Sequence, residues 1–308
     1  SALWPLLFLP YEYFHPDIME YYGSINILKA GVVFSDAVTT VSPSYALEIQ
    51  TPEFGAGLDG FLRSFSRKLT GIVNGIDTRV WDPLNDGSIA HSFSAEDLSG
   101  KAVCKRDLQQ RLSLKKNDGP LFGLIGRLVD QKGIDLVISI MDDIIALGAQ
   151  VAVLGSGDSR YEQDLRSLSA RHKGNLGVVI GFDEDLAHSI EAGADFFLMP
   201  SRFEPCGLNQ MISMRYGTLP IVTRVGGLKD TVTALGEGEN PTGLRVERPT
   251  PSDLLDAVRR ACMLFHEQKA LFSVIRRNAM QKDVGWRSSA IQYYSLYTKM
   301  INFRERKR

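Results

Sequence analysis

The sequence predicts an α/β fold built on a doubly wound parallel sheet. From residue 121 onward, short apolar runs alternate with amphipathic stretches of helical length, which is typical of βαβ units. The runs are apolar throughout, as expected for strands that are covered on both faces. With 308 residues, 44% of them hydrophobic, the chain is long enough for about two domains with sizeable cores. The expected strands are residues 121–125, 150–154, 176–180, 195–199 and 219–223.

Composition and charge exclude several classes of function. Lysine plus arginine number 35 and aspartate plus glutamate 36, so the net charge of −1 gives no global basic field for nucleic acid or an anionic membrane. The longest apolar stretch, residues 2–9, is interrupted by Pro5 and is far shorter than the ~20 residues that span a bilayer. Three widely spaced cysteines lack the spacing of a zinc site or disulfide framework, which fits a reducing compartment: Cys104, Cys206 and Cys262.

The elements ahead of residue 73 follow a different pattern from the sheet. Residues 25–34 have helical spacing, residues 37–41 form an expected strand, and Ser42 is placed to N-cap a further helix. Residues 53–58 are expected to be a loop, and residues 71–77 a strand running into an Asn-Gly turn, a plausible hinge. This segment has too few strands to close a domain by itself. Because it begins directly in core-like sequence without a methionine, we expect the chain to be a fragment of a larger protein.

Helices are expected between and after the strands. Residues 133–147 and 158–171 have amphipathic spacing, whereas the polar residues 82–100 are expected to form a surface excursion. Near the end of the chain, large side chains recur at steps of four and three residues, which an ordinary core-facing terminal helix would explain. These side chains are Trp286, Ala290, Tyr293, Tyr297 and Met300.

The first candidate site follows the strand at residues 121–125. Its turn carries Arg127 and Lys132 with glycine on both sides, and two cations beside a helix start suit a diphosphate. Glycine also lets a backbone approach a ligand closely. The alternative is a solvated basic turn, which remains open for this pair taken alone.

The densest candidate site is the string Pro200-Ser201-Arg202-Phe203-Glu204-Pro205-Cys206-Gly207-Leu208-Asn209-Gln210, which follows another strand and opens a helix. The carboxylate of Glu204, fixed beside a proline, can orient sugar hydroxyls and stabilise developing positive charge. One strand later, Gly226 and Gly227 precede a helix, where backbone amides can meet phosphate oxygens. Ligands of doubly wound sheets bind at the carboxyl ends of the strands, so these turns are expected to converge.

Other strand ends have weaker signals. The string Gly155-Ser156-Gly157-Asp158-Ser159-Arg160 lacks the third glycine of a dinucleotide fingerprint, which disfavours an NAD-dependent oxidoreductase. Residues 183–185, Asp-Glu-Asp, mimic a metal motif of some sugar transferases, but helix capping is the stronger interpretation. Phe182 ends a strand, where its ring could stack on a base or belong to the core. A glycosidase is disfavoured because no second carboxylate pairs with Glu204 at a predictable separation.

Together these strings resemble the carboxyl-terminal part of bacterial glycogen synthases and plant starch synthases, which are retaining glucosyltransferases of the GT-B fold. The resemblance covers essentially the whole chain, and the string from Ser201 to Leu208 is its most specific part. The matching strings are Phe14-His15 with Tyr22-Gly23, Asn26 to Gly31, Thr39 to Pro43, Asn74 to Asp77, Gly126-Arg127 with Gln131 to Gly133, Ser201 to Leu208, Tyr216 to Pro220, Gly226 to Leu228, and Trp286 with Tyr297.

The resemblance implies transfer of glucose from ADP-glucose to the non-reducing 4-hydroxyl of an α-1,4-glucan. Arg127 and Lys132 would bind the diphosphate, Glu204 would hold the donor glucose and stabilise an oxocarbenium-like transition state, and Phe182 would stack on adenine. Phosphates would be held by amides, so that no metal or other cofactor is required. The amides in question are those of Cys206, Gly207, Leu208, Asn209, Gly226 and Gly227. The implied compartment is bacterial cytoplasm or plastid stroma.

The chain also departs from the family pattern. Asn209 stands where relatives commonly have threonine, and Ile212 stands where they have glutamate or tyrosine, which puts a ribose contact in doubt. The family's Lys-Thr-Gly-Gly-Leu and His-Asn motifs of the first lobe do not occur in the sequence. Residues 1–72 would therefore be the tail of the acceptor-side lobe, residues 73–284 the Rossmann-like donor lobe, and residues 285–308 a terminal helix that crosses back to the first lobe. A non-catalytic nucleotide-sugar or glucan-binding module remains the alternative, and ADP-glucose and UDP-glucose are not distinguished.

Overall fold

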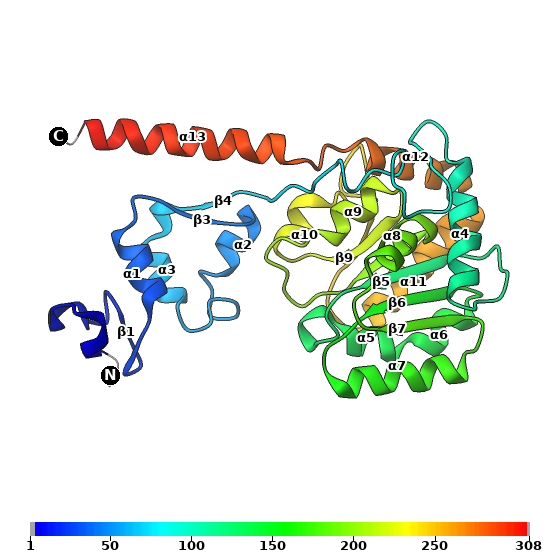
Figure 1. Ribbon diagram of the computed structural model, residues 1–308, viewed down its shortest axis with the longest axis horizontal. Helices are drawn as coiled ribbons and strands as arrows, with labels where there is room; N and C mark the ends of the chain where they lie inside the picture. The colour runs from blue at the N-terminus through cyan, green and yellow to red at the C-terminus, as the bar shows by residue number, and fades with distance from the viewer. Residues whose placement is uncertain (1–3, 307–308) are drawn as a thin grey trace.

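The computed structural model describes residues 4–306 and has the expected α/β fold, with a small N-terminal part beside a larger doubly wound domain (Figure 1). A six-stranded sheet forms the centre of the larger domain, and its strands pair in parallel in the order β10-β9-β8-β5-β6-β7. From the centre of the sheet, β5, β6 and β7 follow one another to one edge, whereas β8, β9 and β10 follow one another to the other edge. Their bounds are β5 Leu121–Ile125, β6 Gln150–Gly155, β7 Leu176–Ile180, β8 Phe196–Met199, β9 Leu219–Thr223 and β10 Leu244–Val246.

All five predicted strands are confirmed, three of them with identical bounds, whereas β10 was not predicted from the sequence. β10 has only three residues and pairs at one edge of the sheet with β9. So short a run carries too little apolar periodicity to be recognised.

Helices lie on both sides of this sheet (Figure 1). The predicted helix over residues 133–147 is wrong in one respect, because it breaks at Ile140 into two short helices. The predicted helix over residues 158–171 is confirmed, with Asp158 accepting a hydrogen bond from the Arg160 amide as its N-cap. The helices are α4 Ser99–Arg111, α5 Ile134–Ser139, α6 Met141–Ala146, α7 Ser159–Arg171, α8 Glu184–Gly193, α9 Asn209–Arg215, α10 Gly226–Thr231, α11 Pro251–Glu267 and α12 Lys269–Gln281, with a 3₁₀ turn at Asp130–Lys132.

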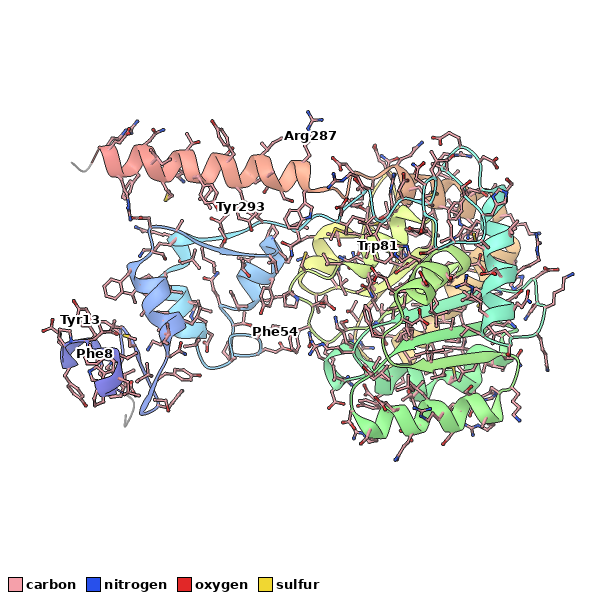
Figure 2. The ribbon with its side chains drawn as sticks, in the orientation of Figure 1. Phe8, Tyr13, Phe54, Trp81, Arg287 and Tyr293 are labelled. Carbon is pink, nitrogen blue, oxygen red and sulfur yellow. The ribbon has the colours of Figure 1, made fainter. Side chains whose placement is uncertain are left out.

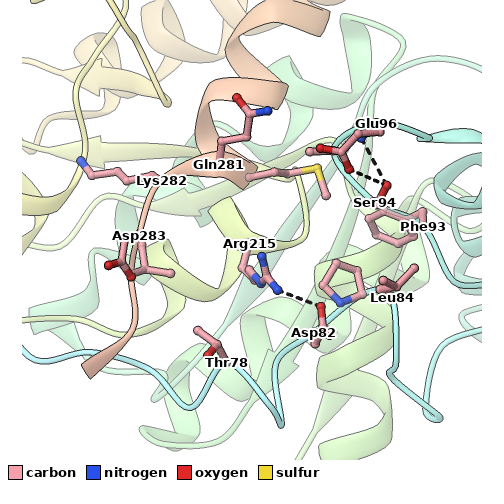
Figure 3. Close-up of a pocket in the computed structure, with 14 residues that line it drawn as sticks. Thr78, Asp82, Leu84, Phe93, Ser94, Glu96, Arg215, Gln281, Lys282 and Asp283 are labelled. Atoms are coloured by element: carbon pink, nitrogen blue, oxygen red, sulfur yellow. Dashed lines mark hydrogen bonds and ion pairs between the residues drawn. The ribbon is translucent and has the colours of Figure 1, made fainter. Parts of the chain in front are cut away.

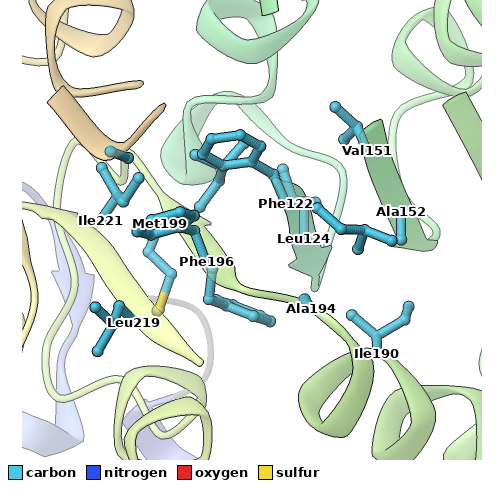
Figure 4. Packing of buried hydrophobic residues seen from close by; sticks show 14 of the residues in the cluster. Phe122, Leu124, Val151, Ala152, Ile190, Ala194, Phe196, Met199, Leu219 and Ile221 are labelled. Atoms are coloured by element: carbon cyan, nitrogen blue, oxygen red, sulfur yellow. The ribbon is translucent and has the colours of Figure 1, made fainter. Parts of the chain in front are cut away.

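The core lies between the sheet and these helices (Figure 4). Phe122 of β5 and Phe196 of β8 stack with ring centroids 5.3 Å apart, and both rings are fully buried. Every residue of β6 and β9 is buried, which is why these runs are apolar without alternation. Burying apolar surface at about 25 cal/mol per Å² makes this cluster the main stabilising feature of the domain.

The N-terminal part is built from short elements. Ser42 N-caps α2 by accepting a hydrogen bond from the Tyr45 amide, as predicted, and Asn26 caps α1 in the same way. The strand predicted over residues 71–77 is wrong in extent, because β4 ends at Gly71. The bounds are β1 Glu20–Tyr21, β2 Ser24–Ile25, α1 Ile27–Phe34, β3 Val38–Thr40, α2 Pro43–Glu48, α3 Asp59–Ser64 and β4 Leu69–Gly71, with 3₁₀ turns at Trp4–Leu7, Tyr11–Tyr13 and Ser66–Lys68.

The chain passes twice between the two parts, and the two passages touch. Ile76 pairs in parallel with Gly285, and the Ile76 amide donates to the Val284 carbonyl at 2.9 Å. The Ser289 hydroxyl donates to the Val73 carbonyl, which fixes the start of the last helix to the first passage.

The terminal helix α13, Trp286–Glu305, runs back beside the N-terminal part (Figure 1). Figure 2 shows Tyr293 pointing from α13 toward this part and Arg287 pointing away from it. Among its described residues only Ser289 is buried, so the interpretation of α13 as a core-facing helix is wrong. Its far end is tied to the N-terminal part by an ion pair between Arg304 and Asp36. Within residues 4–306, no helix has the length and apolar character to cross a membrane.

Candidate functional site

A cleft lies where the order of the strands reverses. β5 and β8 are neighbours in the sheet although β6 and β7 separate them in sequence, so the loops after β5 and β8 diverge and leave a crevice. The cleft has a volume of about 490 Å³. Seven of the predicted site residues line it together: Arg127, Lys132, Glu204, Cys206, Gly207, Leu208 and Asn209.

The turn after β5 supplies the cations. Arg127 is exposed, and its guanidinium donates to the Gln131 side-chain oxygen at 3.1 Å. The Gln131 amide group in turn donates to the Phe203 carbonyl at 3.2 Å, which links the loop after β5 to the loop after β8. The turn closes on Gly133 with φ of 68°, where an added Cβ would lie 2.3 Å from the Pro200 carbonyl oxygen. Glycine is therefore required at this position on both conformational and steric grounds.

Glu204 lies deep in the cleft and is held by two neighbours. Its side chain is 7% exposed, and one carboxylate oxygen lies 2.5 Å from the Lys132 ammonium. The Ser201 hydroxyl donates to the same oxygen at 3.2 Å. A buried carboxylate is stable only with such partners, and Lys132 and Ser201 hold the Glu204 side chain in one orientation. Sequence reasoning predicted Glu204 and Lys132 separately, and it missed Ser201 and Gln131 as supporting residues.

Two groups of backbone amides were predicted to hold phosphate, and they differ in the structure. In residues 4–306, the amides of Gly207, Leu208 and Asn209 donate to no other backbone or side-chain group. The amide of Gly226 donates to the Glu48 carboxylate at 2.7 Å, and that of Gly227 to the Glu204 carbonyl at 3.0 Å. A phosphate at the second group would have to displace these bonds, whereas the first group is open to the cleft.

Asn209 has a structural contact of its own. Its side-chain amide donates to the Ile125 carbonyl at 2.8 Å and so fixes the start of α9 to the end of β5. Ile212, one turn further along α9, is buried at 6% exposure and belongs to the core cluster.

Cys206 lines the cleft, and its thiol is buried there. Burial raises the pKa of the Cys206 thiol, and a backbone hydrogen bond with Asn74 only partly opposes this effect. α9 begins three residues later at Asn209, so the thiol lies outside the first turn of this helix, where the helix dipole would lower its pKa.

The remaining predicted features lie outside the cleft. Phe182 follows β7 and is 91% exposed, so it is not a core residue and its ring is free to stack. Asp183 caps α8 by accepting from the Leu186 amide at 2.9 Å, which confirms the capping interpretation. Arg202 turns away from the cleft and forms a bidentate pair with Asp135 at 2.7 and 2.6 Å. Among residues 4–306, no cluster of three or more histidine, cysteine or acidic side chains could hold a metal.

A second pocket of about 480 Å³ lies away from this cleft, between the loop at residues 78–96 and the end of α12 (Figure 3). An ion pair between Arg215 and Asp82 at 2.9 Å crosses it. The loop is part of the expected surface excursion, but Phe93 is buried at 3% exposure and anchors it to the domain. None of the predicted site residues lines this pocket.

Comparison with known families gives this arrangement a context. Residues 105–269, more than half of the chain, match the family Glycosyl transferases group 1. The chain belongs to that family. Residues 1–64 of this family member also match the Starch synthase catalytic domain family.

Similar proteins of known name are glycogen synthases. That of Anaeromyxobacter dehalogenans (strain 2CP-1) is 49% identical over 294 residues, a match that covers 95% of this chain and 61% of the relative. That of Paracidovorax citrulli is 50% identical over 280 residues, covering 90% of this chain and 55% of the relative. The chain thus spans less than two thirds of the length of these relatives.

A solved structure agrees with the same family assignment. The catalytic domain of starch synthase IV from Arabidopsis thaliana, bound to ADP and acarbose, superposes with a TM-score of 0.89 at 36% identity. The match covers 94% of this chain and 62% of that one. Sucrose-phosphate synthase from Thermosynechococcus elongatus, at 19% identity and a TM-score of 0.60, shares the fold.

Proposed function

We propose that the protein to which this chain belongs is a glycogen or starch synthase, which transfers glucose from ADP-glucose to the non-reducing 4-hydroxyl of an α-1,4-glucan with retention. The observation that carries the proposal is the Lys132–Glu204 pair in the cleft at the reversal of strand order, with Arg127 at its mouth. It is supported by the glycogen synthases at about half identity and by the ADP and acarbose bound to the similar starch synthase.

The donor's diphosphate is assigned to the two loops that meet in the cleft. Arg127 and Lys132 supply positive charge from one side, and the amides of Gly207, Leu208 and Asn209 supply donors from the other. Such charge-assisted hydrogen bonds shorten and strengthen as negative charge develops on the departing nucleoside diphosphate. In this proposal the cations offset that charge and no metal is required.

Glu204 is assigned to the sugar. When the diphosphate attracts the Lys132 ammonium, Glu204 loses part of its charge partner and keeps Ser201 as its hydrogen-bond donor. The carboxylate then accepts hydrogen bonds from glucose hydroxyls and stabilises positive charge at the anomeric carbon in the transition state. Phe182, exposed after β7, is proposed to stack on the adenine ring.

The acceptor glucan is assigned to the interface between this domain and the first lobe. The compartment that fits is a bacterial cytoplasm or a plastid stroma. The domain division proposed from the sequence, residues 1–72, 73–284 and 285–308, follows the same two-lobed plan.

The proposal is tested by calorimetry with ADP and UDP on this chain, using Arg127→Ala, Lys132→Ala and the control Arg259→Ala. Arg259 is an exposed residue of α11 that pairs with Asp256 on the same helix. Arg127→Ala and Lys132→Ala should each weaken ADP binding by tenfold or more, because one charge-assisted hydrogen bond contributes about 1.5 to 3 kcal/mol. Unchanged ADP affinity in both cleft variants would show that the pair is only a solvated basic turn. Wild-type binding without transfer in the full-length protein would favour a non-catalytic nucleotide-sugar-binding module.

A further inference from the structure

Two short helices from the two parts of the molecule, α2 and α10, hold each other by hydrogen bonds at both ends. At one end, Asp230 of α10 accepts from the Ser42 hydroxyl, from the Ser44 amide at 2.9 Å and from the Ser44 hydroxyl at 2.6 Å. At the other end, Glu48 of α2 accepts from the Gly226 amide at 2.7 Å. The helices are therefore antiparallel, and each start is held by a carboxylate from the last turn of its partner.

The two ends of this contact differ in what they touch. Asp230 uses both carboxylate oxygens on the start of α2, where it accepts hydrogen bonds from Ser42 and Ser44. Glu48 uses one oxygen on Gly226, and its other oxygen is buried without a hydrogen-bond partner in residues 4–306. Burial is the main influence that raises the pKa of the Glu48 carboxyl. Packing alone gives no reason for a partly buried carboxyl group whose second oxygen has no hydrogen-bond partner in residues 4–306.

Two adjacent backbone amides, those of Gly226 and Gly227, connect Glu48 to Glu204 in the cleft. The amide of Gly227, next to the one that Glu48 holds, donates to the Glu204 carbonyl at 3.0 Å. A Cβ built on Gly226 would lie 2.0 Å from the Glu204 carbonyl oxygen and 3.5 Å from the free oxygen of Glu48. The Glu204 backbone and the Glu48 carboxylate thus lie against the same glycine, which has φ of 39°.

We propose that Glu48 is a positioning residue for Glu204, which acts through the Gly226–Gly227 turn. By fixing this turn from the N-terminal part, Glu48 sets where the Glu204 backbone lies, and the carboxylate in the cleft reaches the sugar only when α2 is seated against α10. The inference rests on the proposed function, because it assigns to Glu204 the role described above. A displacement of about 1 Å in a group that contacts the transition state can lower a rate by about a hundredfold.

The test compares Glu48→Ala, Glu48→Gln and a matched control, Ser44→Ala, which removes one hydrogen bond at the other end of the same helix pair. In the full-length protein, Glu48→Ala should lower kcat by about tenfold or more while the ADP dissociation constant changes by less than about twofold. Glu48→Gln should recover most of kcat, because its side-chain oxygen can accept the same bond from Gly226. Ser44→Ala should leave kcat near the wild-type value.

Hydrogen exchange on the 308-residue chain provides a readout that does not depend on activity. The amides of Gly226 and Gly227 should exchange faster in Glu48→Ala and at the wild-type rate in Ser44→Ala. Unchanged exchange at these amides in Glu48→Ala would overturn the proposal. Equal losses of kcat in Glu48→Ala and Ser44→Ala would also overturn it, because they would mean that the contact between α2 and α10 only joins the two parts. If Glu48→Ala does not fold, Glu48→Gln and Glu48→Asp provide the test, because the shorter side chain of aspartate cannot reach Gly226. Wild-type kcat and exchange in Glu48→Gln, with a loss of kcat in Glu48→Asp, would support the proposal. Wild-type kcat in Glu48→Asp would overturn it. Failure of the wild-type protein to bind ADP would instead contradict the proposed function and leave the exchange result valid.

Discussion

Single side chains in the cleft carry opposite charges in direct contact. The Lys132 ammonium and the Glu204 carboxylate neutralise each other in the resting protein, at a depth where either charge alone would be costly. A diphosphate offers the ammonium a stronger partner. In the proposed function, a bound diphosphate would draw the Lys132 ammonium away from Glu204 and so couple binding of the nucleotide to release of the carboxylate.

Glu204→Gln should lower turnover much more than it weakens ADP binding. The substitution keeps the shape of the side chain but removes the negative charge assigned to the sugar and its transition state. The measurement is a comparison of kcat in the full-length protein with the ADP dissociation constant from calorimetry. Equal losses in both quantities would assign Glu204 to nucleotide binding instead.

Cys206 should be alkylated slowly at neutral pH. Because burial raises the pKa of its thiol, the reactive thiolate is scarce until the pH exceeds the ordinary thiol value of about 8.5. Mass spectrometry of iodoacetamide-treated peptides, with urea-unfolded protein as the reference, measures this rate. Rapid labelling of folded protein at pH 7 would contradict the expectation.

Residues of the candidate site could be predicted from the sequence when they lie directly after an apolar strand. Arg127, Lys132 and Glu204 each follow an apolar strand, and the parallel sheet brings such positions to one edge. Ser201 lies in the predicted string, but its contact with the carboxylate depends on side-chain direction. Glu48 could not be recognised, because its partner lies 178 residues away in another part of the molecule.

Elements were predictable in proportion to the apolar surface they bury. The central strands are continuous apolar runs and were located to within a residue or two, whereas β10 is too short to be recognised. The break at Ile140 has no signal in the sequence, because both short helices on either side of it bury apolar residues. Tertiary packing decides such breaks.

One carboxylate at the start of β8 should be essential to the packing of the elements around it. Asp195 accepts from Lys105 of α4 at 2.6 Å, from Arg276 of α12 at 3.0 Å and from the Leu121 amide at 3.0 Å. Asp195→Ala should lower the free energy of unfolding by about 3 to 5 kcal/mol, because it leaves two buried cations unpaired. Urea denaturation measures this, with the exposed Asp256→Ala expected to change stability by less than about 0.5 kcal/mol.

The same carboxylate should make stability depend on acid. Burial alone raises the pKa of Asp195, but the charges of Lys105 and Arg276 outweigh this and hold the pKa below its ordinary value. The folded pKa is thus lower than the unfolded pKa of about 3.9, so the contribution is present above pH 3.9 and is lost as the pH falls toward the folded value. Wild-type protein should lose stability over this range more steeply than Asp195→Asn, which has no group to protonate there.

At the scale of the whole molecule, the chain contains the proposed donor cleft together with a short N-terminal part. It spans 61% of the length of the Anaeromyxobacter dehalogenans glycogen synthase. We expect the 308 residues alone to bind ADP but to show no measurable glucosyl transfer, because transfer needs a closed cleft formed by two lobes. Incubation with ADP-glucose and maltoheptaose, followed by chain-length analysis, measures this. Robust extension would contradict the division of roles between the lobes.

The two passages between the parts restrict how those parts can move. Since Ile76 pairs with Gly285 and Ser289 is bonded to Val73, the two connections lie side by side and define a single line. We expect two connections bonded side by side in this way to favour rotation about one axis and to resist twisting between the two parts. Distances measured between several pairs of spin labels, with one label of each pair on α3 and the other on α7, should therefore change together, as rotation about one axis requires. Rotation about one axis would then return α2 to the same position on α10 each time the two parts close, and so restore the same hydrogen bonds between these helices.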